Sequence, residues 1–183
     1  MLAPRVSLPP PRRRLIAPLR WLRALWLLPT NIVGHLAGVL VSGGLPRRVG
    51  GPAARAWLYA IRSGVGLDWV GAVTLGHAIL YRPGIFDGRA GRMILAHELA
   101  HTRQHDVLGP LYLPLHMLAQ SLSALLSLGQ GPRHSRVHDH NPLEQTFICL
   151  GASAYRPLAD GERIPGAPPG CDGDAMLAAF GLG

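Results

Sequence analysis

The hydrophobic positions of the chain fall into three stretches, separated by segments rich in Gly, Pro and Arg. Residues 21–45 are almost continuously apolar, residues 64–86 hold short β-favouring runs punctuated by glycines, and residues 108–129 form a second apolar run. Between the last two, residues 87–107 place apolar side chains at helical spacing on both sides of a helix, a pattern typical of a buried helix. Helices and a short sheet in one chain of 183 residues predict an α+β fold.

The first apolar stretch follows a basic, proline-rich segment. Residues 1–20 contain little that could build a core, and we expect a disordered basic arm there. Residues 21–45 are long enough for a bilayer-spanning helix. Four positions inside this stretch are costly or kinking in lipid: Pro29, Thr30, Asn31 and His35. The stretch is therefore either an apolar anchor, transmembrane or re-entrant, or a kinked helix packed on a soluble domain.

Residues 64–86 predict strands placed directly before the buried helix. The run AVTLGHAILY, residues 72–81, has the length and β-branching of one buried strand, and Arg82-Pro83-Gly84 closes it as a turn. His77 would lie on this strand, either as a structural histidine or as a substrate-binding one. Earlier in the chain, the turn-like PRRVGGP precedes AARAWLYAIR, which predicts a short helix or an extended segment.

The buried helix is expected to begin after Asp87, its N-cap, and to run to Val107. Gly109-Pro110 then ends it. The apolar run 108–129 carries scattered His, Gln and Ser side chains. We interpret it as a core helix that could lie at the membrane surface.

The candidate chemistry lies in the sequence HELAH, residues 97–101. Residues four apart share one face of a helix, so His97 and His101 can point at one metal ion. Glu98 lies roughly 100° further around the axis, where it suits a general base acting on water that the metal activates. His105 is about 12 Å from His97 along a straight helix, too far for the same ion. We therefore place His105 in the second shell of the site or on the surface.

A third ligand is expected from a second helix after residue 140. Asn141 is a plausible N-cap, Pro142 the first helical residue and Glu144 the third. Glu144 is either the third metal ligand or a capping-box glutamate that reaches back to Asn141. The preceding loop supplies alternative ligands or second-shell residues: His134, His138, Asp139 and His140.

The amino-acid composition indicates which classes of partner the protein could bind. The net charge is +8, and all 18 basic residues are arginines. Ten of them lie before, within or after the first apolar segment, at positions 5, 12, 13, 14, 20, 23, 47, 48, 55 and 62. The arginines belong to no recognisable nucleic-acid-binding module, so membrane contact is favoured and nucleic-acid binding is not expected. A hydrophobic content of 48% also suggests membrane contact. Two cysteines, Cys149 and Cys171, form no disulfide framework or CxxC metal site.

The chain resembles the HExxH zinc peptidases (zincins), in the branch whose third ligand is a downstream glutamate (gluzincins). It is more similar still to a group of short, uncharacterised bacterial proteins with HELxHxxQ, LGPLxLP and NPFE motifs. The corresponding segments here are TLGHAIL, HELAHTRQ, LGPLYLP and NPLEQ, in that order. Leu143 stands where that group usually has Phe, and the loop before Asn141 is unusually rich in His.

The resemblance implies a zincin-like domain, which we place over residues 46–156. The composition of residues 157–183 predicts a Pro/Gly-rich tail, with a last short helix in AMLAAFGLG. It also implies a Zn²⁺ cofactor, with His97, His101 and Glu144 as ligands and Glu98 as catalytic base. We expect a metallopeptidase that acts on a peptide or protein at the bacterial cell membrane. The alternative is a non-catalytic membrane or interaction protein with a structural zinc site, in which His138 or His140 takes the water position.

Overall fold

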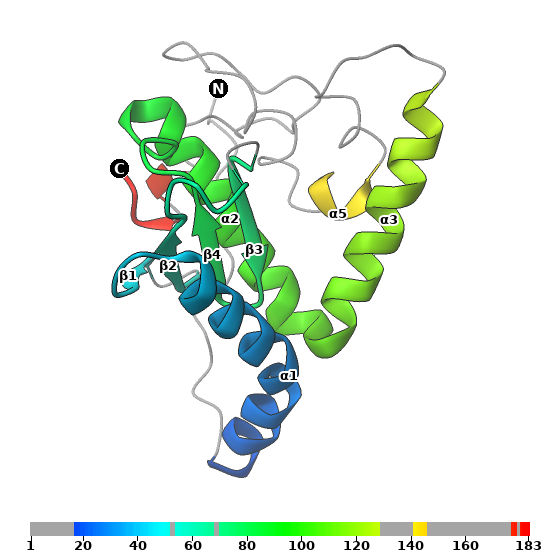
Figure 1. Cartoon of the computed structure of the whole chain (residues 1–183). Helices are drawn as coiled ribbons and strands as arrows, with labels where there is room; N and C mark the ends of the chain where they lie inside the picture. Colours follow the sequence, from blue (N-terminus) through cyan, green and yellow to red (C-terminus); the bar gives the residue numbers. More distant parts are fainter. Residues whose placement is uncertain (1–16, 52–53, 68–69, 129–140, 146–176, 179) are drawn as a thin grey trace, which may run out of the picture.

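A four-stranded mixed sheet lies between two long helices (Figure 1). The computed structural model describes residues 17–51, 54–67, 70–128, 141–145, 177–178 and 180–183. The strands are β1 Arg47–Val49, β2 Ala56–Ala60, β3 Ala72–Leu75 and β4 Ala78–Tyr81. Their order across the sheet is β1-β2-β4-β3, which leaves β3 at an edge. β2 and β4 are parallel and the two outer pairs are antiparallel, so the predicted α+β fold is confirmed.

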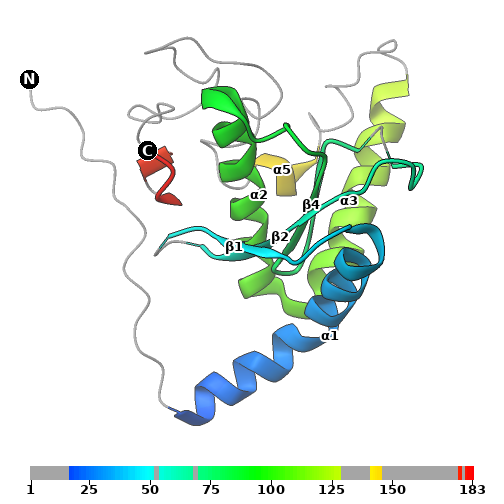
Figure 2. The ribbon, with the colours of Figure 1, turned by 60° about the vertical axis from the view of Figure 1, so that its left-hand side comes forward.

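Both faces of the sheet are covered, because the side chains of the central strands alternate between two apolar layers. Leu58 and Ile79 pack against α2, Gly88–Leu108, in one core. Tyr59 and Leu80 face the other way, toward α1, Ala17–Val41. Figure 2 shows α1 and α2 on opposite sides of the strands.

The predicted single strand over residues 72–81 is instead a hairpin, so that prediction was wrong. Gly76 has φ +66° and turns the chain between β3 and β4. A side chain could not fit there, because a Cβ on Gly76 would lie 2.5 Å from Asn31 Oδ1. That oxygen accepts a hydrogen bond of 2.9 Å from the backbone N–H of His77. His77 therefore lies in the turn that α1 holds, not on a strand.

α2 has the ends predicted for the buried helix to within one residue. Asp87 is its N-cap residue in extended conformation, without a side-chain cap hydrogen bond, and the helix ends at Leu108 before Gly109. A short 3-10 turn, η1 Gly109–Leu111, leads into α3, Tyr112–Ser127. The second apolar run is thus helical, as expected.

α3 is not the core helix that we predicted. Tyr112, Ser123 and Ser127 are its buried residues, whereas seven large apolar side chains at its start or along it are exposed: Leu111, Leu115, Met117, Leu118, Leu122, Leu125 and Leu126. Among the described elements, α3 contacts η1, the end of α2 and α5, Pro142–Gln145. α3 therefore packs on its neighbours mainly through its first turn and through the side that faces α5. The leucines along the rest of its surface stay exposed, so they lie outside the core.

α1 is one unbroken helix that packs on the domain, although Pro29 lies inside it. Its first helical residue, Ala17, lies within the arm predicted over 1–20; residues 1–16 are outside the described part. The stretch Leu19–Val41 is long and apolar enough to cross a membrane by length and composition alone, a test that a signal sequence or a core helix also passes.

At the chain end, Leu177 and Phe180 are buried in the core with α2. Residues 177, 178 and 180 are helical, in the place expected for a last short helix.

Candidate metal centre

α2 presents His97 and His101 side by side in the interior. The two residues are four apart, and their ring centroids lie 4.5 Å from each other. Their Nε2 atoms are 3.0 Å apart. Both side chains are buried, as are Met93 and Leu99 on the same helix. The rings meet edge to face, with an angle of 88° between their planes. The spacing of four residues thus places both imidazoles on one side of the helix, as expected.

Glu144 reaches this pair from α5. Its Oε2 atom lies 2.9 Å from His97 Nε2 and 3.3 Å from His101 Nε2, and its side chain is buried. The segment is held in place by Asn141, whose Oδ1 accepts a 2.9 Å hydrogen bond from the Leu143 N–H. Asn141 Nδ2 also donates to Gln120 Oε1 of α3 at 2.9 Å. The predicted N-cap is confirmed, and the Glu144 carboxylate faces the imidazoles.

These three donor atoms suit a divalent metal ion. Ligand atoms about 2 Å from a tetrahedral ion lie about 3.3 Å from one another, close to the separations of 2.9, 3.0 and 3.3 Å between the two Nε2 atoms and the carboxylate oxygen. Two imidazoles and one carboxylate are the donor set of catalytic zinc sites with an open fourth position. Within the described part of the chain, this is the group of three side chains that could hold an ion.

Gln104 fixes the orientation of one imidazole. Its Oε1 accepts a hydrogen bond from His101 Nδ1 at 2.8 Å, and its Nε2 donates to the Leu143 carbonyl next to Glu144. With its proton on Nδ1, the neutral His101 ring offers the Nε2 lone pair to the centre. Gln104 therefore connects the two elements that supply the candidate ligands.

Glu98 is held beside the pair by the edge strand of the sheet. Thr74 of β3 places its Oγ1 2.6 Å from Glu98 Oε2 and 3.2 Å from the Glu98 backbone oxygen. All of these groups are buried. A hydroxyl that donates to one carboxylate oxygen leaves the other oxygen available as a proton acceptor. Sequence reasoning missed Thr74, although it begins the TLGH motif.

α3 adds two aromatic side chains that sequence reasoning also missed, Tyr112 and His116. The His116 ring lies 5.3 Å from the His101 ring, and His116 Nε2 is 3.4 Å from Glu144 Oε1. Burial, followed by the nearby carboxylates of Glu98 and Glu144, raises the pKa of Tyr112 well above its ordinary value. Its hydroxyl therefore stays protonated. The spacing of four between Tyr112 and His116 was the available signal, since it puts both on one helical face.

His105 lies deeper along α2 and is fully buried, so its predicted alternative as a surface residue is wrong. Its ring contacts those of His77 and Tyr112, with centroids 5.1 and 6.0 Å apart. Neither ring nitrogen has a hydrogen-bond partner among the described residues. Burial, then the neighbouring His77, lowers the pKa of His105 to about 4, although Asp106 opposes the shift.

The His105 pKa predicts an acid-sensitive fold. The unfolded chain takes up a proton near pH 6.5, whereas folded His105 stays neutral down to about pH 4. Stability should therefore fall as the pH is lowered through this window. In metal-free protein, His105→Phe should reduce that loss by about 1–3 kcal/mol. Denaturant unfolding at pH 7 and pH 4.5 measures the difference, and equal pH dependence in both proteins would contradict it.

The rival ligands His134, His138, Asp139 and His140 lie outside the described residues, as do Cys149 and Cys171. His77 does not join the metal group: its Nε2 is 3.1 Å from Asp106 Oδ1, which Arg23 of α1 also contacts. The structure thus gives His77 a role in holding α1 to the end of α2.

Comparison with known proteins gives one match. A family model described as the eCIS core domain matches residues 69–108. No curated protein and no solved structure matches the chain. The matched residues run from the β3–β4 hairpin through α2, and they include HELAH. Over this part, the chain is similar to a domain family associated with zincin-like, metallopeptidase-like proteins.

Proposed function

We propose that the protein is a zinc-dependent hydrolase that cleaves peptide bonds at a membrane. The observation that carries this proposal is the buried convergence of His97, His101 and Glu144 beside Glu98. The match to a family associated with metallopeptidase-like proteins supports it. The apolar outer side of α1 supports the membrane location.

In the proposed reaction, each residue of the site has a role that follows from its position. His97, His101 and Glu144 would hold the ion, which, when bound, lowers the pKa of a water ligand and polarises the scissile carbonyl. Glu98 takes a proton from the attacking water on its carboxylate and gives it to the leaving amine. Thr74 orients Glu98, and Gln104 orients His101. His116 and Tyr112 border the site on the side where α3 lies.

A non-catalytic protein with a structural zinc is the second candidate, and His116 is the observation that favours it. A closed site needs four protein ligands. His116 approaches the carboxylate of Glu144 to 3.4 Å from the side of α3. In a closed site, His116 would be the fourth protein ligand.

Metal content and turnover, measured on one preparation, separate these candidates. Purified full-length protein should contain about one zinc per chain, and a chelator should lower its melting temperature. Zinc-loaded protein should cleave members of a peptide library. One bound zinc without cleavage in any condition would favour the structural site, and absence of zinc binding would contradict both.

Thr74 should tune the catalytic step without affecting metal binding. Thr74→Val keeps the shape of the side chain but removes the donor to Glu98 Oε2, so kcat should fall about tenfold, the size expected for one hydrogen bond to a charged group. Thr74→Ser retains the hydroxyl and should keep most of the activity. Steady-state kinetics with zinc content as control measure both, and equal kcat in the Val and Ser variants would contradict this role.

A further inference from the structure

The two sides of α1 differ in chemistry, and the polar side faces the protein. Thr30 Oγ1 lies 3.4 Å from the Gly109 carbonyl, Asn31 binds the backbone of His77, and His35 Nδ1 lies 2.7 Å from Tyr59 Oη. Gly34 and Gly38 allow close contact, because a Cβ on either would clash with Leu75 or Tyr59. Three of the four positions that looked costly in lipid, Thr30, Asn31 and His35, are therefore turned toward the domain, whereas Pro29 is exposed.

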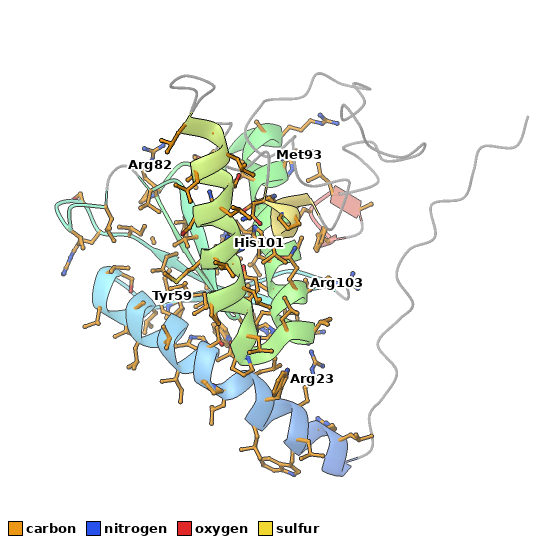
Figure 3. All side chains as sticks on the ribbon, turned by 90° about the vertical axis from the view of Figure 1, so that its right-hand side faces the viewer. Arg23, Tyr59, Arg82, Met93, His101 and Arg103 are labelled. Atoms are coloured by element: carbon orange, nitrogen blue, oxygen red, sulfur yellow. The ribbon has the colours of Figure 1, made fainter. Side chains whose placement is uncertain are left out.

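The outer side of α1 is apolar from end to end. Ten large apolar side chains on it are exposed: Trp21, Leu22, Leu25, Trp26, Leu28, Ile32, Val33, Leu36, Val39 and Leu40. Trp21 and Leu40, near the two ends, are 73% and 75% exposed. Figure 3 shows side chains along α1 that project away from the rest of the domain. So large a continuous apolar surface marks an interaction site.

The middle of α1 is too tightly joined to the domain for a span. α1 contacts β2, β3, β4 and η1 along its length. If the helix crossed a bilayer in this arrangement, the sheet with its open edge strand β3 would enter hydrocarbon. Open sheet edges do not occur there, since their unpaired backbone groups lack hydrogen bonds. The ion pair between Arg23 and Asp106 would also enter the hydrocarbon, where charged side chains are costly.

Charge identifies the occupant of this surface. α1 contains no acidic residue, Arg20 is exposed near its start, and Arg62 packs beside Gly43 just after its end. Arg47 and Arg48 are exposed in β1. Arginines at both ends of an apolar face, with tryptophans at one end, complement anionic lipid headgroups. A second copy of this chain would instead bring like charges together.

We propose that α1 lies flat in the surface of an anionic membrane, with its outer apolar side in the headgroup–acyl boundary, and does not cross the bilayer. Helices of this kind bind through buried apolar area together with attraction to anionic lipid. The surface is separate from the metal centre, so its test requires no measurement of catalysis.

Vesicle flotation tests the surface. The full-length protein should float with vesicles of mixed zwitterionic and anionic lipid, and less with purely zwitterionic vesicles or at high salt. The double variant Ile32→Gln/Leu36→Gln should bind at least about tenfold more weakly. A matched variant on the exposed face of α3, Leu122→Gln/Leu126→Gln, removes the same number of apolar side chains and should weaken binding less than the α1 variant. Unchanged binding of the α1 variant, loss in the α3 variant alone, or a stable dimer in place of lipid binding would overturn the proposal.

Labelling distinguishes a surface helix from a span. In a chain carrying Cys149→Ser and Cys171→Ser, one new cysteine is introduced at a time. It is either Arg20→Cys, near the start of α1, or Leu45→Cys, just after its end. Sealed right-side-out and inside-out membrane vesicles are prepared separately from expressing cells. An impermeant maleimide is then added to each preparation. A surface helix should be labelled at both ends from the same side. Labelling of the two ends from opposite sides would show a span and overturn the proposal.

Discussion

Glu98→Gln should lower kcat by about 10²- to 10⁴-fold, the contribution of a general base, and leave zinc content unchanged. Gln has the size of Glu and can still accept the hydrogen bond from Thr74 Oγ1, which lies 2.6 Å from Oε2 in the wild type. It cannot take a proton. The change therefore removes proton transfer while the packing around HELAH is kept. Peptide hydrolysis and zinc content, measured on the same samples, check the expectation.

Asp87→Asn supplies the matched control, because it removes one carboxylate from the same helix at an exposed position far from the metal group. It should leave hydrolysis near wild type. If Glu98→Gln hydrolyses peptides at the wild-type rate, Glu98 is not the base. If both variants lose activity with their zinc, the effect belongs to folding of α2 and not to chemistry.

The central pair of the site was predictable because it is local. The separation of four residues places His97 and His101 on one helical face whatever the rest of the chain does, and the structure keeps their Nε2 atoms 3.0 Å apart. Glu144 was one of several candidates, because its position depends on how α5 packs against α2 and α3. The approach of Oε2 to 2.9 Å from His97 Nε2 is a tertiary contact that no spacing in the sequence determines.

The residues that the sequence missed share this dependence on tertiary structure. Thr74 reaches Glu98 only because β3 occupies the sheet edge beside α2. His116 reaches Glu144 only because α3 turns back at Gly109 after α2 ends. The single strand predicted over residues 72–81 failed for a related reason. The turn at Gly76 is held by Asn31, a residue more than forty positions earlier in the chain.

α1 shows how one pattern can support two interpretations. Thr30, Asn31 and His35 counted against a helix surrounded by lipid on all sides. They recur on one side of the helix, and that side faces the sheet and η1. Their spacing of one, four and five residues was the available sign of a two-sided helix. α3 lacked such a sign, since its polar residues are scattered among leucines that the structure leaves exposed.

Glu144→Ala should weaken zinc binding by at least about a hundredfold, because loss of a supporting residue around a metal already costs 10- to 100-fold and a direct ligand contributes more. The carboxylate is buried and lies within 3.3 Å of both imidazole Nε2 atoms. Competition titration with a chromophoric chelator measures the affinity. Glu144→Asp keeps the carboxylate but places it one methylene further from the imidazoles. The zinc affinity of this variant should therefore lie between those of the wild type and Glu144→Ala.

The same titration decides between Glu144 and the histidines of the preceding loop. His138→Ala and His140→Ala should bind zinc as wild type if Glu144 is the third ligand. His116→Ala should lower affinity by no more than about 100-fold if it only supports Glu144, and His116→Asn should restore part of it. Wild-type affinity in Glu144→Ala, together with loss in His138→Ala or His140→Ala, would transfer the third position to the loop. A loss in His116→Ala as large as that in Glu144→Ala would make His116 a direct ligand, and the site would then be closed to water.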